Sequence, residues 1–155
     1  MKKFLILFLS ILMPLIVGGV SGYFTSSSIP TWYASLQKPS FNPPNFLFAP
    51  VWTTLYILMG IAVFMIWNQK TILSKTKAYV LWGVQLFINF WWSIIFFYFE
   101  SPKWALVEII FMWFFILFTI LEFRKINKIS GLLLIPYLLW VSFATVLNAA
   151  IFVLN

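Results

Sequence analysis

The sequence predicts an all-α membrane protein, a single domain (1–155) folded as a bundle of five transmembrane helices. The chain is 63% hydrophobic and 8% charged, with a mean hydropathy of +1.01. A soluble domain has about 45–50% apolar and about 25% charged residues, so this chain cannot cover itself with polar surface. Charges and turn residues divide it into five apolar stretches, each close to the roughly 20 residues that cross a bilayer as a helix. No stretch has the alternating period of a membrane barrel strand.

The five predicted spans are 4–25, 46–68, 78–99, 103–122 and 130–154. The first span has a second interpretation, because Lys2 and Lys3 followed by FLILFLSILMPLIVGG also fit a cleaved secretory signal. We favour a retained helix, since the apolar run is long for a signal core and has no clean small-x-small cleavage site.

The connection between the first two spans is unusually aromatic and stiff. It contains the stretch WYASLQKPSFNPP, residues 32–44, with Pro39, Pro43 and Pro44. Prolines reduce the conformational entropy that is lost when a loop is held in place. We therefore predict that this loop closes a binding site as a lid.

Polar, small and aromatic residues recur every four positions in the later spans, so each set lies on one helix face. The sets are Trp52, Tyr56 and Gly60; Gln85, Asn89 and Ser93; Trp104 and Glu108; and Pro136, Trp140, Ala144 and Asn148. Each residue alone can be explained by helix–helix hydrogen bonds, close packing or anchoring at the membrane interface. Together the faces predict an apolar cavity with a few orienting polar groups, which is typical of a small-molecule site.

Basic residues predict the orientation in the membrane. One side of the predicted topology carries most of them, namely Lys2, Lys3, Lys70, Lys75, Lys77, Arg124, Lys125 and Lys128. The other side carries Lys38 and Lys103. The positive-inside rule then places the N-terminus in the cytoplasm and the 26–45 loop and the C-terminus outside.

Composition excludes several kinds of chemistry. The chain has no cysteine and no histidine, and only three acidic residues. It therefore lacks thiol catalysis, Cys/His metal sites, imidazole or thiolate ligands for haem iron, and the commonest general acid–base group. We expect no metal and no resident cofactor. The net charge of +7 is spread over span ends, which indicates lipid contacts rather than a nucleic-acid interface.

The ordered motifs resemble the translocator protein (TspO/MBR) family, also called tryptophan-rich sensory proteins or peripheral-type benzodiazepine receptors. The motifs that carry the resemblance are WYASLQKPSFNPP (32–44), APVWTTLYILMG (49–60), QLFINFWW (85–92), FF (96–97), WALVE (104–108) and PYLLWVSFATVLNAAIF (136–152). They cover nearly the whole chain in the family's order and spacing. The resemblance implies five transmembrane helices, commonly a homodimer, and a pocket capped by the first loop.

The resemblance also implies ligands and site residues. The family binds porphyrins such as protoporphyrin IX, sterols and synthetic benzodiazepine-site ligands, and some bacterial members are reported to degrade protoporphyrin in light. By position, the two tryptophans implicated in that reaction are Trp52 and Trp140, which would be catalytic if the chemistry occurs. The predicted ligand-binding set is Tyr33, Pro43, Trp52, Tyr56, Asn89, Ser93, Trp140, Ala144 and Leu147.

Two departures from the family pattern qualify the resemblance. Phe41 stands where the family usually has a loop tryptophan. The stretch LNAAIFVLN at the end of the chain also lacks the tyrosine and arginine of the animal sterol-recognition pattern. This absence argues against tight sterol binding and indicates a bacterial-type member, in a bacterial cell membrane.

Three functions remain open from the sequence. The first is a protein that binds or senses protoporphyrin or a related tetrapyrrole. The second is an enzyme that degrades this ligand in light, which would need no acid–base residue. The third is a transporter of porphyrins or sterol-like lipids. We rank it last because five spans do not divide into repeats and the predicted interior has almost no charge.

Overall fold

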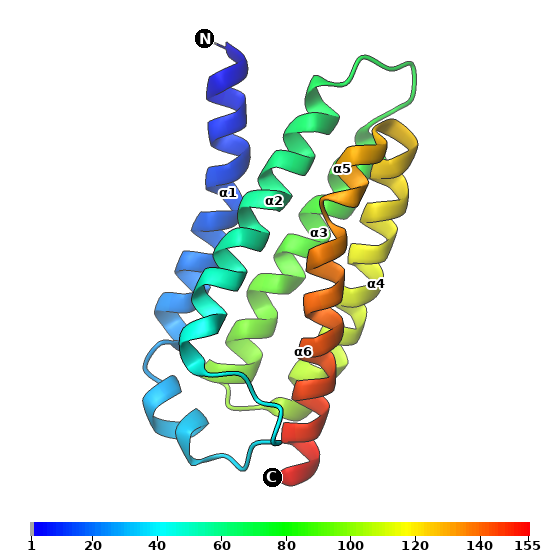
Figure 1. Cartoon of the computed structure of the whole chain (residues 1–155). Helices are drawn as coiled ribbons and strands as arrows, with labels where there is room; N and C mark the ends of the chain where they lie inside the picture. The colour runs from blue at the N-terminus through cyan, green and yellow to red at the C-terminus, as the bar shows by residue number, and fades with distance from the viewer. Residues whose placement is uncertain (1) are drawn as a thin grey trace.

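The structure is a computed structural model that describes residues 2–155. Its five long apolar segments, each able to cross a membrane by length and composition, are Lys2–Thr25, Asn45–Asn68, Thr76–Tyr98, Pro102–Ile126 and Lys128–Leu154. They run side by side along one axis (Figure 1), and the described residues contain no strand. The predicted all-α, five-helix fold class is therefore confirmed.

Helices α1 (Lys2–Thr25) and α2 (Phe48–Asn68) pack directly on one another. Pro14 lies within α1 and cannot bond the carbonyl of Ser10, one turn earlier. Gly60 of α2 packs against that carbonyl and the backbone of Ile11, where a Cβ atom would overlap with both. The missing side chain at Gly60 thus lets the two helices touch at this level.

Helix α3 (Thr76–Ser93) continues as a π-helical turn, Ile94–Tyr98, before a sharp connection to α4 (Pro102–Ile126). Glu100 in this connection has a φ of 51°, in the left-handed region. Pro102 starts α4 at a position where a helix needs no backbone donor. The fourth span ends at Ile126 rather than near 122, because Arg124 and Lys125 complement the carbonyl end of the helix dipole.

The predicted fifth span, 130–154, is two helices rather than one. It divides into α5 (Lys128–Leu132) and α6 (Ile135–Leu154). Pro136 causes the break, because it has no N–H for the carbonyl of Leu132 and its ring would collide with that carbonyl in a continuous helix. The hydroxyl of Ser130 in α5 donates to the carbonyl oxygen of Ala62 at 2.7 Å, which fastens the short helix to α2.

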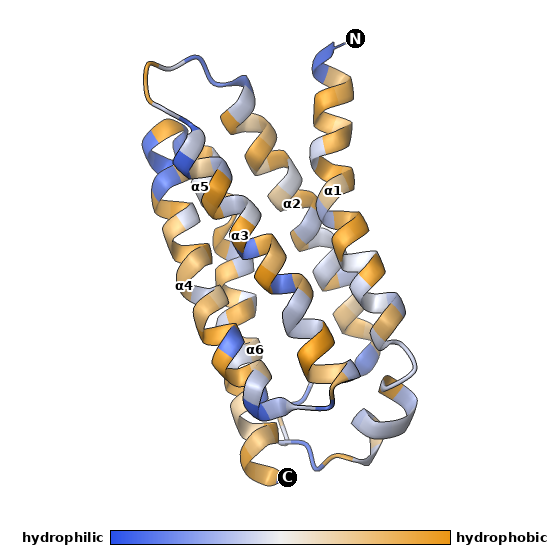
Figure 2. Ribbon diagram, turned by 180° about the vertical axis from the view of Figure 1, so that it is seen from behind, coloured by the Kyte–Doolittle hydropathy of each residue, from blue (hydrophilic) through white to orange (hydrophobic). Residues whose placement is uncertain are grey.

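Hydrophobic residues predominate along the long helices (Figure 2), and each span carries exposed large apolar side chains, as expected in contact with lipid. Helix α1 is the most exposed span. Its buried residues are Pro14, Ser21 and Thr25, and it carries exposed side chains such as Phe4 and Phe8. The interior is built instead around side chains such as Met59 and Met112, both at 0% exposure. The buried hydrophobic core therefore lies mainly between α2, α3, α4 and α6, and α1 packs along one side of it.

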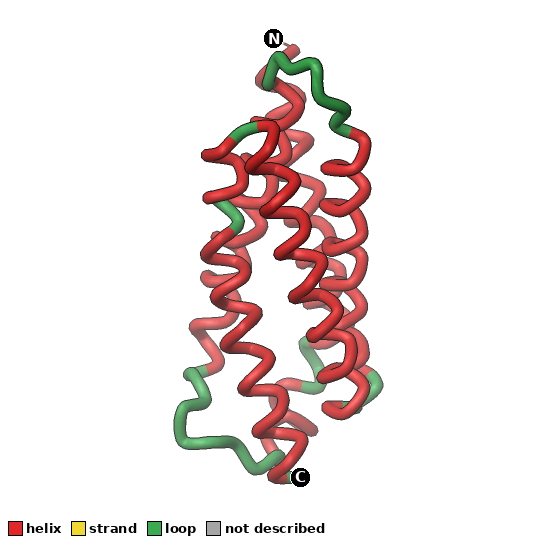
Figure 3. The backbone as a smooth tube through the Cα atoms, turned by 90° about the vertical axis from the view of Figure 1, so that its right-hand side faces the viewer, coloured by secondary structure: helices red, strands yellow, loops and turns green. Residues whose placement is uncertain are grey.

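The connections gather at two opposite ends of the bundle (Figures 1 and 3). The N-terminal end, the α2–α3 loop and the α4–α5 turn lie at one end, where Glu122 pairs with Lys125 at 2.9 Å and Lys77 at 3.6 Å. The first loop, the α3–α4 connection and the C-terminus lie at the other end. The basic residues that predict the orientation are thus brought to a common end.

Candidate functional site

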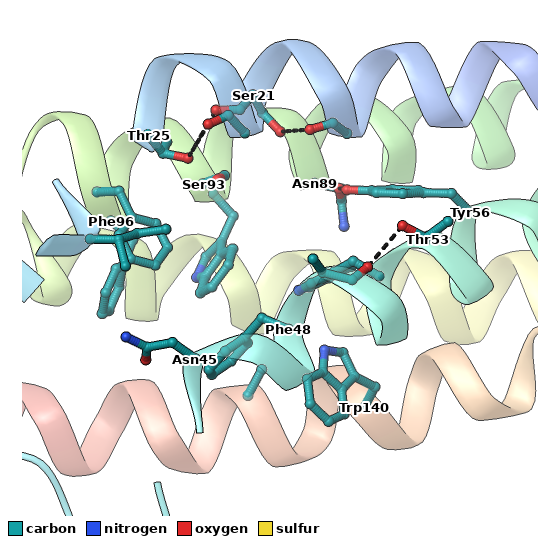
Figure 4. A pocket seen from close by; sticks show the side chains of 18 of the residues that line it. Ser21, Thr25, Asn45, Phe48, Thr53, Tyr56, Asn89, Ser93, Phe96 and Trp140 are labelled. Carbon is teal, nitrogen blue, oxygen red and sulfur yellow. Dashed lines mark hydrogen bonds between the residues drawn. The ribbon is translucent and has the colours of Figure 1, made fainter. Parts of the chain in front are cut away.

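A cavity of about 360 Å³ lies between α1, α2, α3 and α6, at the end of the bundle that carries the first loop. This volume falls within the roughly 300–1,000 Å³ of small-molecule sites. Figure 4 shows Ser21 and Thr25 of α1 on one side of the cavity and Trp140 of α6 on the opposite side. Tyr56, Asn89, Ser93 and Phe96 lie between them.

Aromatic rings form most of the cavity wall. Trp52 stacks on Tyr56 with 5.6 Å between ring centroids and lies 6.4 Å from Trp92 on α3. Across the cavity, Trp140 of α6 meets Phe48 of α2 edge to face at 6.1 Å. The rings present both flat faces and edges, so the wall can hold an aromatic ligand by offset stacking.

Hydrogen bonds between helices use most of the polar atoms around the cavity. The hydroxyl of Tyr56 donates to Oδ1 of Asn89 at 2.7 Å, and Nδ2 of Asn89 donates to the hydroxyl of Tyr137 at 3.0 Å. Similarly, Nε1 of Trp92 donates to Oδ1 of Asn148 at 3.2 Å. These amides therefore bind α2, α3 and α6 together, and they have little capacity left for a ligand.

One buried donor at the cavity remains free. Among the described residues, three buried side-chain atoms have no hydrogen-bond partner: Oε1 of Gln85, Oε2 of Glu108 and Nε1 of Trp140. Only Trp140 lines the cavity. A buried donor without a partner costs about 1–3 kcal/mol, so a ligand acceptor placed at this indole N–H would recover free energy.

The cavity wall carries no formal charge. Across residues 2–155, every side chain that lines it is apolar, aromatic, hydroxyl or amide. The titratable groups on the described wall are the phenols of Tyr33 and Tyr56. The site is suited to holding an uncharged, hydrophobic molecule.

The first loop closes one end of the cavity. Tyr33 lies in the π-helical turn Ile29–Tyr33, and its hydroxyl donates to Oδ1 of Asn42 at 2.8 Å. Burial raises the pKa of Tyr33 above its ordinary value, so the phenol is neutral at physiological pH. The ammonium group of Lys38 lies 4.7 Å from the centroid of the same ring. The loop is therefore internally braced around Tyr33.

The end of α6 holds this loop through a second set of bonds. The backbone N–H of Gln37 donates to Oδ1 of Asn155 at 2.9 Å, and Nδ2 of Asn155 donates back to the carbonyl of Gln37 at 3.0 Å. Phe41 also meets Phe143 of α6 edge to face at 6.3 Å. The lid is thus fastened to the helix that carries Trp140.

The structure brings most of the predicted ligand-binding residues to one cavity. Those that line it are Tyr33, Trp52, Tyr56, Asn89, Ser93, Trp140, Ala144 and Leu147. Pro43 does not line it and lies half-buried in the loop, where its carbonyl accepts a hydrogen bond from Asn42. Gln85 shares the helix face of Asn89 but is buried between Trp82 and Met59, away from the cavity. Whether the lining residues bind a ligand stays a prediction.

Sequence reasoning missed the contribution of α1. The wall includes Leu15, Gly18, Gly19, Ser21, Gly22 and Thr25 from this helix. The ring of Tyr56 occupies the space where a Cβ atom of Gly18 would stand. A signal was present, because Gly18 and Gly22, like Ser21 and Thr25, are four positions apart on one face. The same glycine and serine run also resembles a signal-peptide end, which obscured it.

A second, shallower groove lies on the outside of the bundle, next to the start of α4. It is lined by Ile95, Phe99, Ser101, Trp104, Val107, Glu108 and Phe111. The nearby Lys103 places its ammonium group 5.7 Å from the centroid of the Trp104 ring. Glu108 therefore lies at a half-buried position with one carboxylate oxygen unpartnered.

Comparison with known proteins identifies the family. A model described as the TspO/MBR family matches residues 10–154. The chain is 42% identical over 158 residues to the tryptophan-rich protein TspO of Chlorobaculum tepidum, covering 99% of this chain and 98% of that protein. It is 42% identical over 146 residues to the tryptophan-rich protein TspO of Archaeoglobus fulgidus, covering 94% of each. It is also 35% identical over 139 residues to the translocator protein of Bos taurus, covering 88% of this chain and 82% of that protein.

These matches agree with the observed fold. The family match covers residues 10–25 of the first span and the whole of the other four, and each span is long and apolar enough to cross a membrane. The chain is thus an integral membrane protein, and it belongs to the TspO/MBR family.

Proposed function

We propose that this protein binds protoporphyrin IX or a related tetrapyrrole in the cavity beneath the first loop, and that it acts in tetrapyrrole binding and sensing. The observation that carries this proposal is the wall itself, in which Trp52, Trp92 and Trp140 surround an uncharged space. A flat macrocycle can stack on such rings.

Two further features favour a metal-free tetrapyrrole. The chain has no histidine or cysteine to supply an imidazole or thiolate for haem iron. The unpartnered Nε1 of Trp140 offers one hydrogen bond to an acceptor on the ligand. The proposed selectivity is therefore for the free porphyrin over its iron complex.

A fluorescence titration in lipid nanodiscs tests the proposal. Protoporphyrin IX should quench tryptophan emission saturably, and haem should bind more weakly. Trp140→Phe should reduce the quenching, whereas the control Trp67→Phe should not, because Trp67 lies outside the cavity. Synthetic benzodiazepine-site ligands should displace the porphyrin from the same space. Quenching that does not saturate would contradict the proposal.

Light-driven degradation of the bound porphyrin is the second candidate function. It is favoured by the placement of Trp52 and Trp140 at one cavity, since indole rings are oxidised more readily than other aromatic side chains. Absorption spectra taken before and after illumination, with and without oxygen, separate it from plain binding. An unchanged porphyrin spectrum in both conditions would leave binding as the sole function.

We also propose the location and assembly that the sequence predicts. The protein would lie in a bacterial cell membrane with its N-terminus in the cytoplasm, because the basic residues gather at the N-terminal end of the bundle. It would form a homodimer, as the family resemblance implies. Mass measurement of the protein released from nanodiscs tests the dimer, and a monomer mass alone would contradict it.

A further inference from the structure

The cavity reaches the surface of the molecule on one side. The lining residues with exposed surface are Gly19 and Gly22 of α1, Asn45 in the turn before α2, and Ala49 and Thr53 in the first turns of α2. Those contributed by α3 and α6 are buried or half-buried. The opening therefore lies in the seam between the last turns of α1 and the first turns of α2.

The spacing of residues on α2 places this opening against α1. Ala49, Thr53 and Gly60 recur at the period of one helix face. Gly60 packs on the backbone of α1 at Ile11. Ala49 and Thr53 lie on the same face of α2 as Gly60, so they also face toward α1. The two helices are thus in contact at Gly60, and only small side chains separate them at Ala49 and Thr53.

Apart from the Asn45 amide, the polar groups at the edge of the opening are hydroxyls whose hydrogen bonds stay within their own helices. The hydroxyl of Thr53 donates to the carbonyl of Ala49 at 2.8 Å. On α1, Ser21 and Thr25 likewise donate to carbonyls of their own helix, at 3.1 and 3.0 Å. A hydrophobic molecule crossing the seam would therefore break no hydrogen bond between α1 and α2.

The depth of the opening suits an amphiphile. Gly19 lies six residues before the end of α1, or about 9 Å along the helix at about 1.5 Å per residue. This position falls in the outer part of the hydrocarbon, near the headgroups. A porphyrin with carboxylates at one edge would rest at this depth with its ring in lipid and its carboxylates at the interface.

We propose that the tetrapyrrole enters and leaves the cavity sideways from the bilayer, between Gly19 and Gly22 of α1 and Ala49 and Thr53 of α2. This inference rests on the proposed function, because it assigns a route to the same ligand. A lateral path keeps the ring out of water. The alternative path, through the first loop, is closed by Tyr33 and by the double hydrogen bond between Gln37 and Asn155.

Leucine substitutions in the seam test the route with little risk to the fold. A Cβ atom at Gly19 or Gly22 would meet nothing within 4 Å, and leucine favours a helix more than glycine does. Gly83 of α3 is a matched control, because it is also an exposed helical glycine with nothing within 4 Å of an added Cβ. It does not line the cavity.

The readout is the rate of porphyrin exchange. Stopped-flow measurements of tryptophan quenching, with the protein in vesicles, give the association and dissociation rates of the porphyrin. Both rates should be about tenfold slower for Gly19→Leu and Gly22→Leu, which corresponds to a barrier raised by about 1.4 kcal/mol. A blocked route slows association and dissociation alike, whereas a lost contact with the cavity wall speeds dissociation, so the two rates together separate a change of route from a change in the wall. Gly83→Leu should exchange porphyrin at the rate of the unmodified protein.

A reversible block gives a second test. The chain has no cysteine, so Gly22→Cys creates a single thiol in the seam. Coupling a bulky group to it through a disulfide should slow exchange, and reduction should restore the rate. Unchanged rates in the seam variants would overturn the lateral route. Failure of the unmodified protein to bind porphyrin would overturn the proposed function itself, which distinguishes the two outcomes.

Discussion

The hydroxyl of Tyr56 on α2 lies 2.7 Å from Oδ1 of Asn89 on α3, and this hydrogen bond fixes the ring on which Trp52 stacks. Asn89 also donates to Tyr137 of α6, so one amide joins three helices at the cavity. Asn89 is 2% exposed. Its side chain therefore positions the aromatic rings that form the cavity wall.

We predict that Asn89→Leu destabilises the protein. The substitution leaves the hydroxyls of Tyr56 and Tyr137 without this partner in a buried site, at a cost of about 1–3 kcal/mol per unsatisfied group. The thermal unfolding midpoint in nanodiscs should fall clearly. Ser93→Ala is the control, because this cavity-lining hydroxyl takes part in no side-chain hydrogen bond found among the described residues. An equal change in both variants would contradict the role given to Asn89.

Trp52→Phe and Trp140→Phe should separate binding from photochemistry. Phenylalanine keeps most of the apolar bulk, so each variant should lose roughly 1 kcal/mol of porphyrin binding, the size of one aromatic pair. Phenylalanine is much harder to oxidise than indole, so light-driven bleaching should fall far more than affinity. Full bleaching by the double variant would show that these tryptophans carry no chemistry.

We expect Asn155→Ala to speed the opening of the first loop. The variant removes both hydrogen bonds to Gln37, each worth about 0.5–1.5 kcal/mol. Limited proteolysis should then cut within residues 34–44 faster than in the unmodified protein. Asn155→Asp keeps an acceptor for the N–H of Gln37 and should give an intermediate rate. Identical cleavage in all three proteins would mean that this pair does not hold the loop.

The orientation can be tested with single cysteines in this cysteine-free chain. Ser35→Cys lies at an exposed position of the first loop, and Ser74→Cys at an exposed position of the α2–α3 loop. A membrane-impermeant maleimide added to intact spheroplasts should label the first variant and spare the second. The reverse pattern would place the N-terminus outside.

Glu108→Gln should leave the unfolding midpoint unchanged or raise it. The carboxyl group has a buried oxygen with no partner, and a charge at this position in a membrane helix would be costly. Glutamine keeps the shape without the charge. A clear loss of stability would reveal a partner for Glu108, such as a bound lipid or a second subunit.

Helix number and the main cavity-lining residues could be predicted because both depend on local periodicity. A face with Trp52 and Tyr56, or with Trp140 and Ala144, is visible in the sequence at the helical period. The break at Leu133–Leu134 was missed because the fifth apolar stretch is long enough to cross the membrane without it. The local signal was Pro136, which the sequence pattern placed on one face of a continuous helix together with Trp140.

The role of α1 could not be predicted from local pattern alone. A glycine such as Gly22 is equally compatible with packing, with a signal-peptide end or with an open seam. Its meaning depends on which helix face lies opposite, and that is set by the contact between Gly60 and Ile11. The pairing of Gln37 with Asn155 is likewise a contact between distant parts of the chain that no local spacing encodes.

The bond between Gln37 and Asn155 joins the lid to the same helix that carries Trp140, so the two cannot respond to a ligand independently. If the closed loop favours the bound ligand, then by thermodynamic reciprocity the bound ligand favours the closed loop to the same degree. Occupancy of a site inside the membrane is thereby converted into the shape of a segment outside the hydrocarbon. A partner on that side of the membrane could read whether the cavity is full without touching the ligand.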